Sequence, residues 1–109
     1  MQVRRGQAFL QDFEDQYRWY LSKAGEKVAE HYFKALEISI EKIEMYPHRG
    51  RLRNFSHPSL LGIRSYAVES PFARHIVFYR FEKETLFLER VLHGARDLRR
   101  RLQEPPRTP

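Results

Sequence analysis

Cysteine is absent from the 109-residue chain. Disulfide bridges, thiolate catalysis and cysteine-ligated zinc are therefore excluded, and the composition is compatible with a reducing compartment. No apolar run approaches the roughly 20 residues that a helix needs to cross a bilayer. The basic residues near the N-terminus are not followed by the apolar stretch of a signal peptide. We therefore expect a cytoplasmic protein without a membrane partner.

Acidic residues are scarce in the second half of the chain. Residues 1–50 carry eight Lys/Arg and eight Asp/Glu, whereas residues 51–109 carry twelve and six, so the second half holds the whole net charge of +6. This surplus suggests an anionic partner, either nucleic acid or an acidic protein surface. The alternative is that the positive charge only keeps the protein soluble.

Recognisable cofactor and metal motifs are also missing. The five histidines are scattered along the chain, at His31, His48, His57, His75 and His93. No pair of them has metal-ligand spacing supported by carboxylates. There is no glycine-rich phosphate loop and no Ser/His/Asp constellation. The sequence therefore predicts neither a metal ion nor a cofactor.

The first half of the chain predicts a short strand over residues 2–6 and then two amphipathic helices. Phe9, Phe13 and Tyr17 recur at helical spacing from Gln7 onward. A break around Gly25 is followed by a longer apolar stripe, formed by Val28, Tyr32, Leu36, Ile40 and Ile43. Pro47 ends this helix, because proline disfavours helix at the preceding residue. The short break predicts an antiparallel helical hairpin.

The second half changes to strand-like periodicity after a loop over residues 47–61. Three β-branched and aromatic-rich segments with short links predict an antiparallel meander: 62–69, 74–81 and 85–92. Residues 95–102 return to helical character. Residues 103–109 contain three prolines and no core residues, so they predict a flexible tail after a single domain over residues 1–102.

These elements predict an α+β fold, in which the helical hairpin packs on one face of an antiparallel sheet and a short C-terminal helix follows. The central strand is apolar on both sides, because Val77 and Tyr79 alternate with Ile76 and Phe78. The hairpin can cover one face, but the last helix is short. We therefore expect a partner to cover part of the second face.

The segment ERVLHGARDL, residues 89–98, resembles the last strand and exit turn of toxins of the RelE/ParE superfamily. Weaker matches lie in order along the chain, at Pro47-x-x-Gly50-Arg51, residues 62–64 and residues 74–80. The resemblance implies a toxin encoded beside a cognate antitoxin. In this superfamily, ParE-like members bind DNA gyrase and RelE-like members are ribosome-dependent mRNA endoribonucleases.

The resemblance favours the ParE-like branch, a DNA gyrase inhibitor without catalytic residues. RelE-like enzymes carry a Tyr or His near the C-terminus, and here none follows His93. The alternative is a RelE-like endoribonuclease in which Arg64 and Arg90 hold a phosphate and His93 transfers a proton. A structural ion pair for Arg64 and a simple turn at His93 also fit the sequence. A degenerate binder without toxicity stays a third possibility.

The resemblance also implies a small, acidic, partly disordered antitoxin as the partner. Its acidic residues are expected to meet the arginines of the second half, namely Arg64, Arg90, Arg96, Arg99, Arg100 and Arg101. The alternative for the run over residues 99–101 is a solvated face of the last helix.

Overall fold

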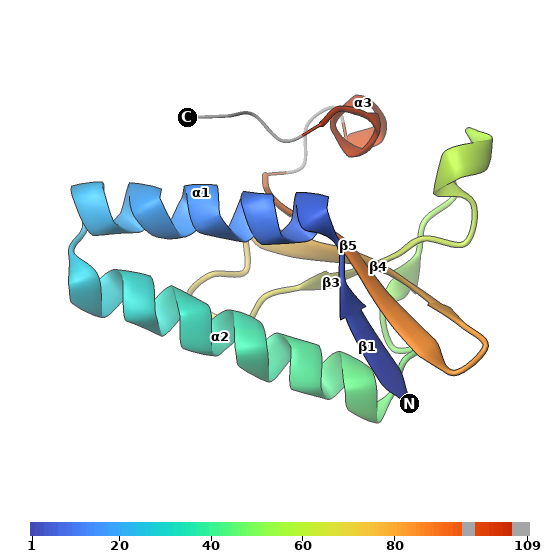
Figure 1. Cartoon of the computed structure of the whole chain (residues 1–109), viewed down its shortest axis with the longest axis horizontal. Helices are drawn as coiled ribbons and strands as arrows, with labels where there is room; N and C mark the ends of the chain where they lie inside the picture. Colours follow the sequence, from blue (N-terminus) through green and yellow to red (C-terminus); the bar gives the residue numbers. More distant parts are fainter. Residues whose placement is uncertain (95–97, 106–109) are drawn as a thin grey trace.

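The computed structural model of the chain describes residues 1–94 and 98–105. Two antiparallel helices lie against one face of a five-stranded sheet (Figure 1). The helices are α1 (Gln7–Lys23) and α2 (Glu26–Met45). The strands are β1 (Gln2–Arg5), β2 (Arg51–Leu52), β3 (Arg64–Ala67), β4 (His75–Glu82) and β5 (Thr85–His93). A short 3₁₀ helix, η1 (Pro58–Leu60), precedes β3, and α3 (Leu98–Gln103) follows β5.

The helical hairpin is confirmed, and its apolar stripes form the main core. Gly25 makes the turn between the helices with a φ of 96°, a backbone conformation that glycine adopts readily. The α2 helix ends at Met45, one residue before the position that Pro47 restricts. The fully or nearly fully buried side chains that meet between hairpin and sheet include Phe9, Tyr32, Leu36, Ile40, Ile43, Val77, Tyr79, Leu86 and Leu88.

The three predicted strands form the expected antiparallel meander, β3-β4-β5. The sheet as a whole is mixed, because β1 pairs in parallel with β5, and its strand order is β1-β5-β4-β3-β2. The predicted loop over residues 47–61 contains two elements that the sequence did not reveal, β2 and η1. Both are too short to show a hydrophobic period.

The second sheet face is largely covered by the chain itself. Ile63, Phe78 and Leu92 are buried there, and Phe55, Ile76 and Leu102 pack against them. Leu102 belongs to α3, which also contacts η1. The expectation that this face needs a partner is therefore wrong for its centre, because the loop before β3 supplies cover that the sequence did not predict.

The C-terminal helix extends through Gln103, the first residue of the predicted tail, while residues 106–109 of that tail lie outside the described residues. Within the described ranges, no helix combines the length and apolar character that crossing a bilayer requires.

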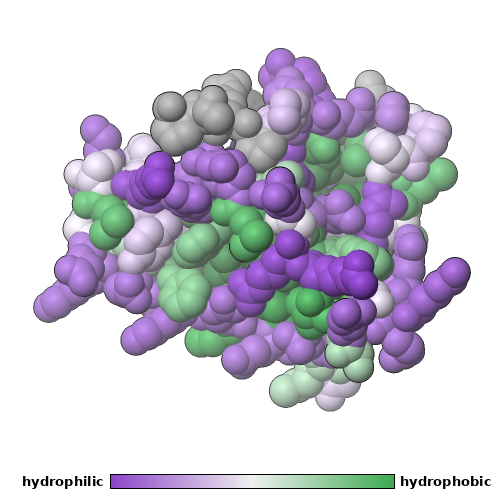
Figure 2. Space-filling model, in the orientation of Figure 1, coloured by the Kyte–Doolittle hydropathy of each residue, from purple (hydrophilic) through white to green (hydrophobic). Residues whose placement is uncertain are grey.

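The face of the molecule that carries the hairpin is a mosaic. In Figure 2 hydrophobic surfaces appear between hydrophilic ones near the middle of this face. The exposed large apolar side chains of the two helices are Leu10, Trp19, Leu21, Phe33, Ile38 and Met45. Scattered exposure of this kind is normal for a folded domain.

Candidate functional site

Arg90 on β5 ties α1 to the C-terminal segment. Its Nε and Nη2 donate to the two carboxylate oxygens of Asp12 on α1, at 2.7 and 2.9 Å. Its Nη1 donates to the backbone carbonyls of Arg101 and Glu104, at 3.0 and 2.6 Å. Only 7% of Arg90 is exposed. The guanidinium is therefore largely buried and is engaged by Asp12 and by two carbonyls near the end of α3.

The Asp12 carboxylate accepts hydrogen bonds from both a side chain and the backbone of β5. Besides Arg90, its carboxylate accepts a hydrogen bond from the backbone N–H of Val91 at 3.1 Å. Burial raises the pKa of Asp12, although the hydrogen bond from Arg90 lowers it. Desolvation thus outweighs the attraction of Arg90 in its effect on this pKa, as can happen in a buried ion pair. The two side chains depend on each other.

Arg64 on β3 fastens the loop that follows α2. Its Nη1 donates to the carbonyls of His48 and Gly50, at 3.1 and 2.9 Å. The Tyr79 hydroxyl completes the anchor, because it donates to the carbonyl of Pro47 at 2.7 Å and accepts from the Gly50 N–H at 2.9 Å. Arg64 is partly exposed. Its hydrogen bonds therefore hold the loop after α2 against β3.

His93 ends β5 opposite His75 of β4, and the two ring centroids lie 4.7 Å apart. His75 is 2% exposed, and its Nε2 shares a hydrogen bond of 2.8 Å with the Tyr20 hydroxyl. Burial, together with the nearby His93, lowers the pKa of His75 to about 4. His75 is therefore neutral near pH 7.

Two grooves flank α3. The larger, about 1000 Å³, runs between α1 and the C-terminal segment, and both Arg90 and His93 line it, but Arg64 does not. The arginine run lies partly beside it. Arg101 donates to the His93 carbonyl at 2.8 Å, and Arg100 lies 3.6 Å from the carboxylate of Glu104. Arg96 lies outside the described residues, and Arg99 falls within α3.

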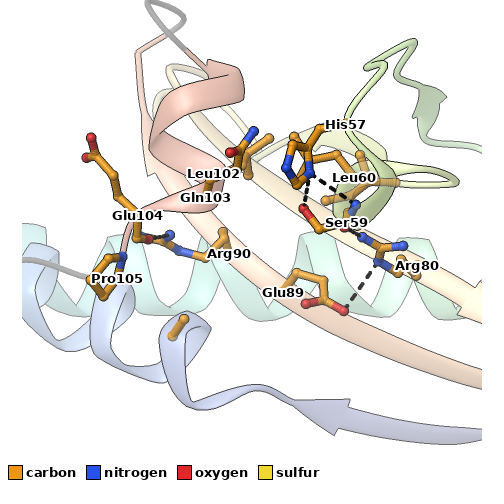
Figure 3. Close-up of a pocket in the computed structure, with 12 residues that line it drawn as sticks. His57, Ser59, Leu60, Arg80, Glu89, Arg90, Leu102, Gln103, Glu104 and Pro105 are labelled. Atoms are coloured by element: carbon orange, nitrogen blue, oxygen red, sulfur yellow. Dashed lines mark hydrogen bonds and ion pairs between the residues drawn. The ribbon is translucent and has the colours of Figure 1, made fainter.

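The second groove, about 610 Å³, lies between the sheet, η1 and α3 (Figure 3). Arg80 of β4 donates to the carbonyls of Ser59 and Leu61 and lies 3.6 Å from Glu89 of β5. The His57 Nδ1 accepts from the Ser59 N–H at 3.2 Å. Arg80, Glu89 and His57 thus interact with other groups of the protein, and the contacts of Arg80 join β4 to η1.

The sequence of the chain, compared with models of protein families, matches the ParE toxin of type II toxin-antitoxin systems, parDE, over residues 3–98. The chain belongs to the ParE toxin family. The earlier resemblance to the RelE/ParE superfamily is thereby confirmed. No curated protein matches the sequence.

A solved structure described as the chromosomal ParDE TA system from P. aeruginosa has the same fold. It superposes with a TM-score of 0.70, is 15% identical, and the match covers 87% of this chain and 97% of that chain. At this identity the likeness shows the fold alone. The α+β architecture, with its helical hairpin and short C-terminal helix, is therefore that of a ParE-like domain.

Two residues of this ParE-family toxin that matter structurally were missed from the sequence. Asp12, the partner of Arg90, lies 78 positions away, and nothing local marks it. Arg80 lies in the strand motif over residues 74–80, but the sequence does not show that it binds the carbonyls of Ser59 and Leu61. Across residues 1–94 and 98–105, no three His, Cys, Asp or Glu side chains gather as a group that could hold a metal ion.

Proposed function

We propose that this ParE-family toxin arrests growth by binding DNA gyrase, and that a cognate acidic antitoxin neutralises it in the cytoplasm. The observation that carries the proposal is the match to the ParE toxin family over residues 3–98, nearly the whole folded domain. The excess of basic residues in the second half supports an acidic partner.

Binding, not catalysis, is the mode of action that the contacts support. A ribonuclease of the alternative kind needs Arg64, Arg90 and His93 around one phosphate. Arg90 is engaged by Asp12 and by carbonyls near α3, and Arg64 binds carbonyls of the loop after α2. Both arginines have hydrogen-bond partners within the protein, so the ribonuclease alternative has less support.

The surface offered to the antitoxin includes the exposed part of the arginine run. Arg100 is exposed and Arg101 partly so. Apolar contacts would supply most of the affinity, while the charges would orient the partners and speed association. Because the antitoxin binds only the folded toxin, the complex should melt at a higher temperature than the toxin alone.

Expression of the toxin without the neighbouring gene tests this function in cells. We expect growth arrest with disturbed nucleoids and intact transcripts, reversed when the adjacent gene is co-expressed. New cleavage ends in translated mRNA would instead support the ribonuclease. Normal growth with abundant, folded toxin would contradict both gyrase inhibition and mRNA cleavage. The remaining explanation would then be a binding protein without toxicity.

A further inference from the structure

The outer edge of β2 presents backbone groups away from the sheet. Arg51 pairs with Ser65 and Leu52 pairs with Arg64, and the Arg53 N–H donates to the Ile63 carbonyl at 2.9 Å. Inward and outward backbone groups alternate along an antiparallel ladder. Since Arg53 bonds inward, the N–H and C=O of Leu52 point outward. This edge therefore carries a donor and an acceptor for another strand.

The two faces of this edge have different chemistry. Side chains alternate between the faces of a strand, so Arg51 shares a face with Ser65 and Leu52 shares the opposite face with Arg64. Arg53 lies on the Ser65 face, because its Nη1 donates to the Ser65 hydroxyl at 3.2 Å. Arg51 is exposed, and Leu52 is 56% exposed. At the edge, the first face therefore presents the cationic Arg51 and Arg53, and the second presents the apolar Leu52 beside Arg64.

Exposed apolar and aromatic side chains extend this edge toward the end of α2. Met45 and Tyr46 are 71% and 59% exposed, and they line a shallow hollow with residues 47–49. The Arg49 guanidinium lies 5.0 Å from the centre of the Tyr46 ring and 5.8 Å from that of Tyr66. Met, Tyr and Arg are the residue types enriched in protein interfaces.

We call the surface formed by Met45, Tyr46, Arg49, Arg51, Leu52 and Arg53 the edge patch. Its charge is uncompensated in the sequence, because residues 45–68 contain four arginines and no Asp or Glu. The opposite edge of the sheet differs. On β1, Arg5 donates to both carboxylate oxygens of Glu37 on α2, at 2.9 and 2.7 Å. Arg5 of β1 is thus neutralised by an acid, whereas the edge patch gathers three arginines from a segment that contains no acid.

We infer that the edge patch binds an extended acidic segment of the antitoxin as a sixth strand beside β2, an inference that rests on the proposed function. Backbone hydrogen bonds to Leu52 set its register, as in other cases of strand addition. Its side chains alternate, with acidic residues facing Arg51 and Arg53 and apolar residues facing Leu52 and Tyr46. The arginines of the edge patch thus select the alternating sequence pattern of the partner.

Calorimetry with the purified product of the adjacent gene tests this inference on the full-length toxin. The variant Arg51→Glu/Arg53→Glu should weaken binding by roughly tenfold or more, because like charges face each other in the complex. Leu52→Pro should do the same, since it removes the outward N–H without touching the inward ladder. Leu52→Ala retains that N–H and should lose less affinity than Leu52→Pro. The control Arg4→Glu/Lys34→Glu makes the same charge change elsewhere and should bind like wild type.

Melting curves ensure that each variant is folded before binding is compared. Wild-type binding with unchanged affinity for Arg51→Glu/Arg53→Glu and Leu52→Pro overturns the inference and leaves the proposed function intact. Failure of the wild-type toxin to bind the antitoxin overturns both. Loss of affinity for a single-stranded oligonucleotide, with antitoxin binding unchanged, also overturns it and identifies the patch as a nucleic-acid surface.

Discussion

Replacing Arg90 by alanine is expected to destabilise the toxin by about 3–5 kcal/mol, the cost of breaking a buried ion pair. The substitution leaves the Asp12 carboxylate buried, with the Val91 N–H at 3.1 Å as a remaining donor. It also removes the donor shared by two carbonyls at the end of α3. The free energy of unfolding, from urea titration followed by circular dichroism, measures the loss.

Two further variants separate the ion pair from general damage. Arg74→Ala removes an exposed arginine just before β4 and should change stability by less than about 0.5 kcal/mol. The double variant Asp12→Leu/Arg90→Met removes both charges and should be more stable than Arg90→Ala, because no unpaired charge stays buried. Equal stability of Arg90→Ala and wild type would contradict the structural role of the pair.

Gly50→Ala is expected to destabilise the toxin by about 2–4 kcal/mol, the sum of overpacking and lost hydrogen bonding. A Cβ at this position would lie 2.3 Å from the Tyr79 hydroxyl oxygen and 2.6 Å from its ring. Tyr79 is fully buried and cannot move aside freely. The hydrogen bonds of Tyr79 to Gly50 and Pro47 would be strained or broken, and the loop between α2 and β2 would be less firmly attached to the sheet.

Tyr79→Phe provides the matched comparison for this loop. It removes the hydroxyl and its two hydrogen bonds, but leaves the ring in the core. In the Tyr79→Phe background Gly50→Ala should cost less, because the atom in closest contact is gone. Thermal melting of the four proteins completes the cycle. Full additivity of the two substitutions would show that Gly50 does not depend on Tyr79.

Local sequence patterns predicted the helical hairpin and the meander, because both arise from contacts between neighbours along the chain. The stripe from Phe9 and the stop at Pro47 appear as expected. The parallel pairing of β1 with β5 joins the two ends of the domain, and no short-range period encodes it. The two-residue strand β2 is likewise invisible to periodicity, although it defines one edge of the sheet.

The candidate site was harder to predict for a related reason. An arginine in a strand shows its charge in the sequence, but the acid or carbonyl that neutralises it depends on the tertiary fold. Arg90 meets an aspartate of α1 and the end of α3, so a residue expected on the surface is buried. Arg51 and Arg53, which fall in the loop predicted over residues 47–61 and were not identified from the sequence as binding residues, lie at the open edge of the sheet.

Gyrase supercoiling in the presence of purified toxin shows whether the toxin acts on this enzyme. Relaxed plasmid, ATP and gyrase from the same organism are mixed with increasing toxin, with and without prior addition of the antitoxin. We expect that supercoiling is lost, or that cleaved DNA accumulates, and that the antitoxin restores normal activity. Undiminished supercoiling with folded toxin in large excess over gyrase would contradict this expectation.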